Sequence, residues 1–173
     1  MAEWLYEINE DNSCRYVLGT VGSNPLICVG VNPSTAEPNN LDPTLRSVDR
    51  ISRNNGYNSW IMINLYPQRA TDFSNVDKDC NVNMVNENIT EICNLLSEYR
   101  GADIWAAWGN LIDQRPYLID CLKKINNSVL QCECNWITYG KINKSGNPHH
   151  PLYLAADAAK QGFDIKSYLV KVK

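Results

Sequence analysis

Residues 26–36 read Leu-Ile-Cys-Val-Gly-Val-Asn-Pro-Ser-Thr-Ala, and this stretch decides how the rest of the chain can fold. Its first six residues are apolar or glycine, and they follow the turn-forming residues 22–25. Such a short apolar run predicts a strand buried on both faces, as at the centre of a parallel sheet. Pro33 cannot continue a central strand, and it keeps Asn32 extended. The sequence therefore predicts a polar amide at the carboxyl end of a core strand, where open α/β sheets bind ligands.

The rest of the sequence alternates between short apolar runs, which predict strands, and segments with helical spacing of apolar residues, which predict helices. Further strands are predicted at residues 60–63, 103–108 and 134–138, and helices at residues 43–55, 81–99, 114–125 and 155–161. Two short strands at residues 4–8 and 15–20 predict a hairpin on the edge of the fold. The order predicts an α/β fold with a four-stranded parallel sheet between helices. At 173 residues, the chain is expected to form one domain spanning residues 1–173.

Composition narrows the classes of function. The net charge is −3, which argues against a protein that coats nucleic acid non-specifically. No apolar run approaches the roughly 18 residues of a membrane helix, so no membrane partner is expected. The first residues lack a basic segment followed by an apolar core, and the odd count of seven cysteines suits a reducing compartment. These features predict a cytoplasmic protein.

Cysteine spacing does not point to a metal. Cys132 and Cys134 are one residue short of a Cys-x-x-Cys ligand pair, and the other cysteines are scattered. A phosphate-binding glycine-rich loop and a serine nucleophile elbow are also absent from the sequence. We therefore expect no metal and no cofactor.

Polar side chains gather at the predicted strand ends. Asn64 ends the second core strand as Asn32 ends the first, and both histidines of the chain, His149 and His150, follow the last core strand. Because parallel strands end at one edge of a sheet, these groups are expected to converge. A plainer interpretation is that one histidine caps a loop and the other faces solvent.

The cationic side chains also allow two interpretations. Arg46, Arg50 and Arg53 lie at helical spacing, which is ordinary for a solvated helix face. Alternatively, Arg46 points toward the Asn32 loop and holds a phosphate, assisted by the backbone N–H groups at the start of the helix. Arg69 lies in a loop at the same edge and could add to a small anion-binding patch.

Four short motifs resemble the uracil-DNA glycosylase superfamily, a parallel four-stranded α/β fold with an α/β/α arrangement. They are residues 30–34 (Gly-Val-Asn-Pro-Ser), Asn64, residues 108–109 (Trp-Gly) and residues 150–152 (His-Pro-Leu). The longer patterns Asn-Pro-Ser-Thr-Ala, Asp-Pro-Thr and His-Pro-Leu-Tyr-Leu resemble more closely a family of bacterial and phage proteins known as domain of unknown function 1643. This second resemblance covers nearly the whole chain.

The glycosylase resemblance implies catalytic roles for Asn32 and His150. Asn32 would position water for attack at the sugar C1′, and His150 would donate a hydrogen bond to the departing base. Asn64 would bind the base edge, because an amide offers a donor and an acceptor side by side.

The resemblance also implies a wider set of residues for base or nucleotide binding. Leu152 or Tyr153 would fill the space of a flipped base. Tyr66 or Tyr153 could stack on the base, and Pro33 and Ser34 belong to the same site as part of the first motif. The implied ligand is a nucleotide, or single-stranded nucleic acid or a flipped base.

Three functions stay open at this point. The first is an N-glycosidase that hydrolyses the base–sugar bond in DNA or a nucleotide. The second is a non-catalytic protein that binds a nucleotide or modified base, which is suggested because an amide at Asn32 cannot act as a strong general base. The third is an interaction module whose polar edge is merely structural.

Overall fold

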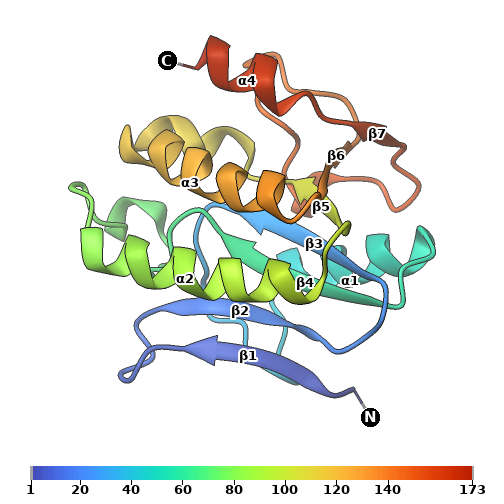
Figure 1. The fold of residues 1–173 in the computed structure, drawn as a ribbon, viewed down its shortest axis with the longest axis horizontal. Helices are drawn as coiled ribbons and strands as arrows, with labels where there is room; N and C mark the ends of the chain where they lie inside the picture. The colour runs from blue at the N-terminus through green and yellow to red at the C-terminus, as the bar shows by residue number, and fades with distance from the viewer. Residues whose placement is uncertain (1, 173) are drawn as a thin grey trace.

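The computed structural model describes residues 2–172, and within them seven strands form one mixed sheet in the order β1-β2-β4-β3-β5-β6-β7. The strands are β1 (Trp4–Ile8), β2 (Arg15–Thr20), β3 (Pro25–Gly30), β4 (Ser59–Asn64), β5 (Asp103–Ala106), β6 (Asn135–Tyr139) and β7 (Lys160–Gly162). The central strands β4, β3, β5 and β6 run parallel. The β1–β2 hairpin and β7 add antiparallel strands at opposite edges, as Figure 1 shows.

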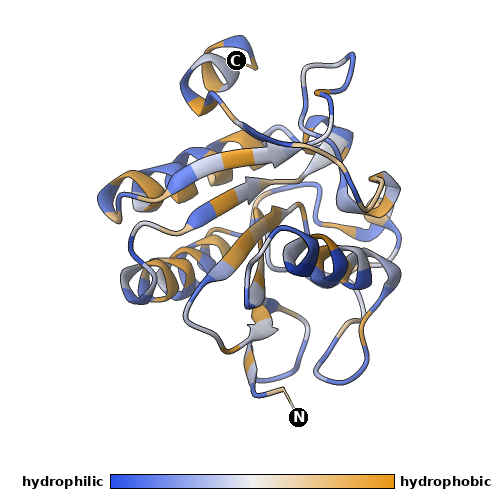
Figure 2. Ribbon diagram, turned by 90° about the vertical axis from the view of Figure 1, so that its right-hand side faces the viewer, coloured by the Kyte–Doolittle hydropathy of each residue, from blue (hydrophilic) through white to orange (hydrophobic). Residues whose placement is uncertain are grey.

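Helices cover both faces of this sheet. They are α1 (Pro43–Asn54), α2 (Val82–Glu98), α3 (Tyr117–Gln131) and α4 (Ile165–Lys171), with short 3-10 turns η1 (Phe73–Asn75), η2 (Gly109–Gln114) and η3 (Pro151–Tyr153). Helices α2 and α3 lie side by side on one face, and α1 lies on the other (Figure 1). The helices carry both hydrophobic and hydrophilic residues (Figure 2). Buried apolar residues such as Val48 of α1, Ile92 of α2 and Leu122 of α3 belong to the core. Helix α1 begins as predicted, with the Asp42 carboxylate capping the Leu45 N–H and Pro43 at the first helical position.

The direction of the chain connections reverses between β3 and β5. The connection through α1 carries the chain from β3 to β4, and the connection through α2 carries it to β5 on the other side of β3. The loops after β3 and β5 therefore leave the sheet in opposite directions. Ligands of open α/β sheets bind outside the strand ends at such a switch point.

Two apolar layers sandwich the sheet. One lies under α2 and α3, and the other lies under α1 and includes Leu26, Cys28, Leu45, Trp60 and Met62. Because side chains alternate along a strand, Asn64 continues the Trp60 and Met62 series and points toward the α1 layer. The polar end of β4 thus opens into the space next to the start of α1.

The α/β class, the edge hairpin and the core strands are confirmed, while three predictions need correction. The sheet has seven strands rather than four, because β2 pairs with β4 and β7 pairs with β6. No helix forms at residues 155–161, since residues 160–162 pair with Ile137–Tyr139 and complete the edge of β6. The helix predicted at residues 114–125 spans Tyr117–Gln131. Among residues 2–172, none of the helices is both long and apolar enough to span a bilayer.

Candidate functional site

A small pocket lies where β3 and β4 end, and we call it the Asn64 pocket. It encloses about 80 Å³. Its lining comes from five parts of the chain: Arg15, residues 30–34, Asp42 with Thr44 and Leu45, Met62 with Asn64, and His150. Pockets that enclose a drug-sized ligand measure about 300–1,000 Å³, so this one can enclose only part of such a ligand.

The Asn64 side chain forms the floor of this pocket with both of its polar atoms unsatisfied. It is 1% exposed, and neither Nδ2 nor Oδ1 has a hydrogen-bond partner within residues 2–172. Gly30 lies opposite it in the parallel register, and a Cβ there would sit 2.9 Å from Asn64 Oδ1. Leaving buried amide groups unsatisfied costs about 1–3 kcal/mol each. The amide is thus ready to bind a ligand that offers a donor and an acceptor.

Asn32 shapes the loop that forms one wall. Its Nδ2 donates to the carbonyl oxygens of Pro33 at 3.0 Å, Gln68 at 3.2 Å and Ala70 at 3.1 Å. These bonds join the loop after β3 to the loop after β4. Because Nδ2 is fully engaged, Oδ1 is the atom of this side chain that can accept a hydrogen bond from a bound molecule.

His150 contributes a hydrogen-bond donor. Its Nδ1 accepts the backbone N–H of Leu152 at 3.1 Å, so the proton of the neutral ring lies on Nε2. Burial lowers the pKa of His150 below 6.5, and the neighbouring His149 adds to this effect while Asp42 opposes it. Gly109, whose φ is +62°, lies beside the His150 backbone, since a Cβ added at Gly109 would come within 3.2 Å of His150 Cβ. A neutral imidazole donor thus borders the pocket at pH 7.

Arg15 is a further pocket residue, one that the sequence patterns do not predict. Its side chain is 2% exposed, and Nη1 donates to the Ala36 carbonyl oxygen at 3.1 Å. Nε has no hydrogen-bond partner in the described part of the chain. Burial, and then the nearby Arg69, lower the pKa of Arg15 to about 10, so it stays charged at pH 7. An arginine at the first position of a predicted strand is the only signal that the sequence carries for it.

The structure brings five of the predicted residues together around the Asn64 pocket: Asn32, Pro33, Ser34, Asn64 and His150. It does not bring the others there. Tyr66 is fully buried on the other side of the sheet, where its hydroxyl donates to Asp77 at 2.7 Å and its ring packs on Tyr117. It cannot stack on a base in this pocket.

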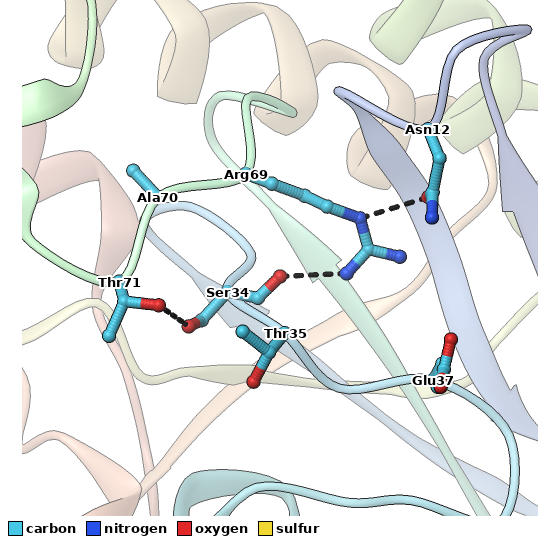
Figure 3. Close-up of a pocket in the computed structure, with 7 residues that line it drawn as sticks. All are labelled: Asn12, Ser34, Thr35, Glu37, Arg69, Ala70 and Thr71. Atoms are coloured by element: carbon cyan, nitrogen blue, oxygen red, sulfur yellow. Dashed lines mark hydrogen bonds between the residues drawn. The ribbon is translucent and has the colours of Figure 1, made fainter.

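Arg69 lies behind the 33–36 loop and borders a separate, more open cavity of about 350 Å³ (Figure 3). Its guanidinium donates to the carbonyl oxygens of Ser34 at 2.7 Å and Ala36 at 3.2 Å. It also donates to Asn12 Oδ1 at 3.0 Å and to the Tyr6 hydroxyl at 2.7 Å. Arg69 therefore fixes the loop and does not face the Asn64 pocket.

The remaining predicted residues lie outside the lining of the pocket. Arg46 is exposed on α1 and donates to the Leu41 carbonyl oxygen. Leu152 is half-buried in the turn that follows His150, and Tyr153 is 79% exposed. The exposed Tyr153 ring has its centre 6.4 Å from that of His150, so it lies near the site without bordering it.

No group of three or more His, Cys, Asp or Glu side chains gathers at a metal-binding distance among residues 2–172. The seven cysteines carry free thiols. The chemistry that the pocket offers is thus that of two amides, one imidazole, one guanidinium, the Asp42 carboxylate and the hydroxyl groups of Ser34 and Thr44.

Comparison with known proteins adds one relationship. No curated protein and no solved structure matches the chain. The model of a family described as "Protein of unknown function (DUF1643)" matches residues 15–152, a span that begins at Arg15 and includes every residue of the Asn64 pocket. Because the match covers most of the chain, the protein belongs to the DUF1643 family.

Proposed function

We propose that this protein recognises a nucleobase or nucleotide in the manner of the uracil-DNA glycosylases and hydrolyses the bond between base and sugar. One observation carries the proposal. The buried Asn64 amide, with neither polar atom partnered within residues 2–172, shares a small pocket with Asn32 and the His150 imidazole.

The chemistry of Asn64 favours a base edge on which a donor stands next to an acceptor. Its amide N–H and C=O are complementary to the carbonyl and ring N–H of uracil, thymine, hypoxanthine and guanine. They are also complementary to the exocyclic amine and ring nitrogen of adenine and cytosine, so Asn64 alone does not select among the bases. A pocket of about 80 Å³ suits insertion of the ring while the sugar stays at the entrance.

The hydrolysis would run through charge separation between base and sugar. The C1′–N bond would break with its electron pair going to the base, and a water oxygen would bond to C1′. The proton that this water loses would pass to solvent, and the departing base anion would take up a proton from solvent to become the neutral free base. His150 Nε2–H would donate to the base oxygen as negative charge develops, and Asn32 Oδ1 would accept a hydrogen bond from the water. Removing one such donor typically lowers a rate by about 10²–10³. The products are the free base and a sugar that carries a hydroxyl at C1′.

The test is release of free base from single-stranded DNA, duplex DNA and free nucleotides that carry varied bases. We expect release of base from at least one of these substrates, and loss of that release in Asn64→Ala. The matched control is Asn83→Ala, an exposed asparagine at the start of α2. If no substrate yields free base from the wild-type protein, the enzymatic function is wrong.

A second candidate is a protein that binds the same ligand without cleaving it. Asn32 favours it, because its Nδ2 is committed to three carbonyls and an amide oxygen is a poor base for activating water. Calorimetry with the same compounds, followed by mass spectrometry of the recovered ligand, separates the two functions. Tight binding with an intact ligand would establish the second.

A further inference from the structure

We propose that Arg15 forms an anion-binding subsite within the Asn64 pocket, and that this subsite holds the phosphate of a nucleotide whose base lies on Asn64. The inference rests on the proposed function and narrows it, because the ligand would be a phosphate-bearing compound and not a free base or nucleoside.

The first support is the state of the Arg15 guanidinium. It is 2% exposed, its Nε lacks a hydrogen-bond partner within residues 2–172, and it borders the pocket. The ion pairs formed at 4.0 Å or less among the described residues do not include it. A buried charge is normally paired, because removing it from water is unfavourable. A bound anion would supply the partner that this guanidinium lacks.

The second support is the position of Arg15 in the fold. β2 runs antiparallel to β4, so the first residue of β2 lies at the edge where β4 ends in Asn64. The Arg15 N–H donates to the Pro67 carbonyl oxygen at 3.0 Å, which ties it to the loop that follows Asn64. The base-reading amide and the guanidinium therefore come from neighbouring strands and meet in one pocket.

The charges around Arg15 also favour an anion. Arg69 donates to the same Ala36 carbonyl oxygen as Arg15, so a second guanidinium lies close by. The start of the 12-residue helix α1 borders the pocket at Thr44 and Leu45 and adds a positive dipole end. Asp42 is the one opposing charge in the lining, and its attraction for Arg15 partly offsets these positive groups. Its carboxylate caps the Leu45 N–H at 2.9 Å and does not form an ion pair with Arg15 at 4.0 Å or less.

The phosphate could come from a monoester on a free nucleotide or from a diester in a single strand, and Arg15 would bind the same oxyanion in both. The experiment is calorimetry of the wild-type protein with inorganic phosphate, with deoxynucleosides and their 5′-monophosphates, and with single-stranded trinucleotides. We expect a monophosphate or a trinucleotide to bind at least 10-fold more tightly than the matching nucleoside. A monophosphate preferred over the trinucleotide identifies a free nucleotide as the ligand, and the reverse identifies a strand.

The variants are Arg15→Gln and, as a control that removes the same charge from an exposed site, Arg46→Gln. Arg15→Gln should bind nucleotide and nucleoside equally, whereas Arg46→Gln should keep the 10-fold difference. Equal binding of nucleoside and nucleotide by the wild-type protein would overturn the subsite even if Arg15→Gln failed to fold. Phosphate binding that depends on Arg15, without tighter binding of any base-bearing compound, would keep the subsite and refute the proposed function. If Asn64→Ala loses base selectivity but retains phosphate binding, the result would support both the Arg15 subsite and the proposed function.

Discussion

Arg15 and Arg69 donate hydrogen bonds to the same atom, the Ala36 carbonyl oxygen, at 3.1 Å and 3.2 Å. Two guanidinium groups that share one acceptor repel each other, and Arg69 accordingly contributes to the lowered pKa of Arg15. Apart from this shared acceptor, the two arginines have different surroundings. Arg69 binds the 33–36 loop and borders the separate cavity of about 350 Å³, while Arg15 borders the Asn64 pocket.

Replacing Arg69 should lower stability. Arg69→Met removes the bonds to Ser34, Ala36, Asn12 and Tyr6, and the free energy of unfolding should fall by about 3 kcal/mol. Urea denaturation measures this change. Arg46→Met, which removes an exposed arginine, should change it by less than about 0.5 kcal/mol. A similar effect of the two substitutions would contradict the structural role of Arg69.

Asn32→Asp tests whether the hydrogen-bond donor at residue 32 stabilises the fold, because it replaces the amide by a carboxyl group of similar size. The introduced carboxylate would face three carbonyl oxygens that now accept from Nδ2, so unfolding at pH 7 should become easier by about 3 kcal/mol. Burial beside these oxygens raises the folded-state pKa of the introduced carboxyl, because only its protonated form can donate. The deficit should therefore shrink as the pH falls toward 4.

The control for this prediction is Asn32→Ala, which loses the same bonds without adding a charge. Its deficit should be smaller than that of Asn32→Asp at pH 7 and independent of pH between 7 and 4. Urea denaturation at both pH values gives the comparison. An Asn32→Asp protein as stable as wild type at pH 7 would show that the three carbonyls do not need this donor.

Much of this site follows from the sequence, and the rest depends on packing that the sequence does not reveal. Asn32 and Asn64 end adjacent parallel strands, so strand patterns alone predict that they meet. Arg15 escapes such reasoning because the hairpin could lie at any edge of the fold, and only the β2–β4 pairing brings it beside Asn64. Tyr66 follows Asn64 by two residues, yet its side chain lies in the opposite layer, a choice that local sequence does not encode.

The C-terminal segment also shows a difference between what the local sequence favours and what tertiary packing decides. Residues 155–161 are rich in alanine, which favours a helix locally. β6 instead needs hydrogen-bond partners along its outer edge, and residues 160–162 supply them. Tertiary pairing thus overrides a weak local preference.

Gly30→Ala should close the Asn64 pocket. The added methyl would lie 2.5 Å from Met62 Cε and 2.9 Å from Asn64 Oδ1, so it would occupy the space in front of the amide. Binding of the nucleotide that the wild-type protein prefers should weaken at least 10-fold. The free energy of unfolding should fall by only about 1–2 kcal/mol, because the Met62 methyl is the flexible end of its side chain.

A matched control for that substitution is Gly162→Ala, where nothing lies within 4 Å of the added carbon. It should leave nucleotide affinity unchanged in the same calorimetric assay. Full affinity in Gly30→Ala would place the ligand elsewhere on the protein.

His150 should make stability depend on pH. Its pKa is lowered in the folded protein, so the unfolded chain binds a proton more readily around pH 6.5. The contribution of neutral His150 to the free energy of unfolding is complete above pH 6.5, and it is lost as the pH falls through the lowered pKa. His150→Asn can still accept the Leu152 N–H but does not titrate, so the stability of wild type relative to this variant should decrease between pH 7.5 and 5.

Urea denaturation across that pH range measures the difference. His149→Gln should retain most of the dependence, because burial is a larger cause of the His150 shift than the neighbouring imidazole. A constant difference between wild type and His150→Asn would show that His150 titrates alike in the folded and unfolded chains.

The three carbonyls held by Asn32 have a consequence for affinity. Because one amide group fixes both loops before any ligand arrives, their conformational entropy is lost during folding and not during association. Even a molecule of a few heavy atoms can then bind measurably, so fragment-sized heterocycles soaked into crystals would be an efficient way to find what this family recognises.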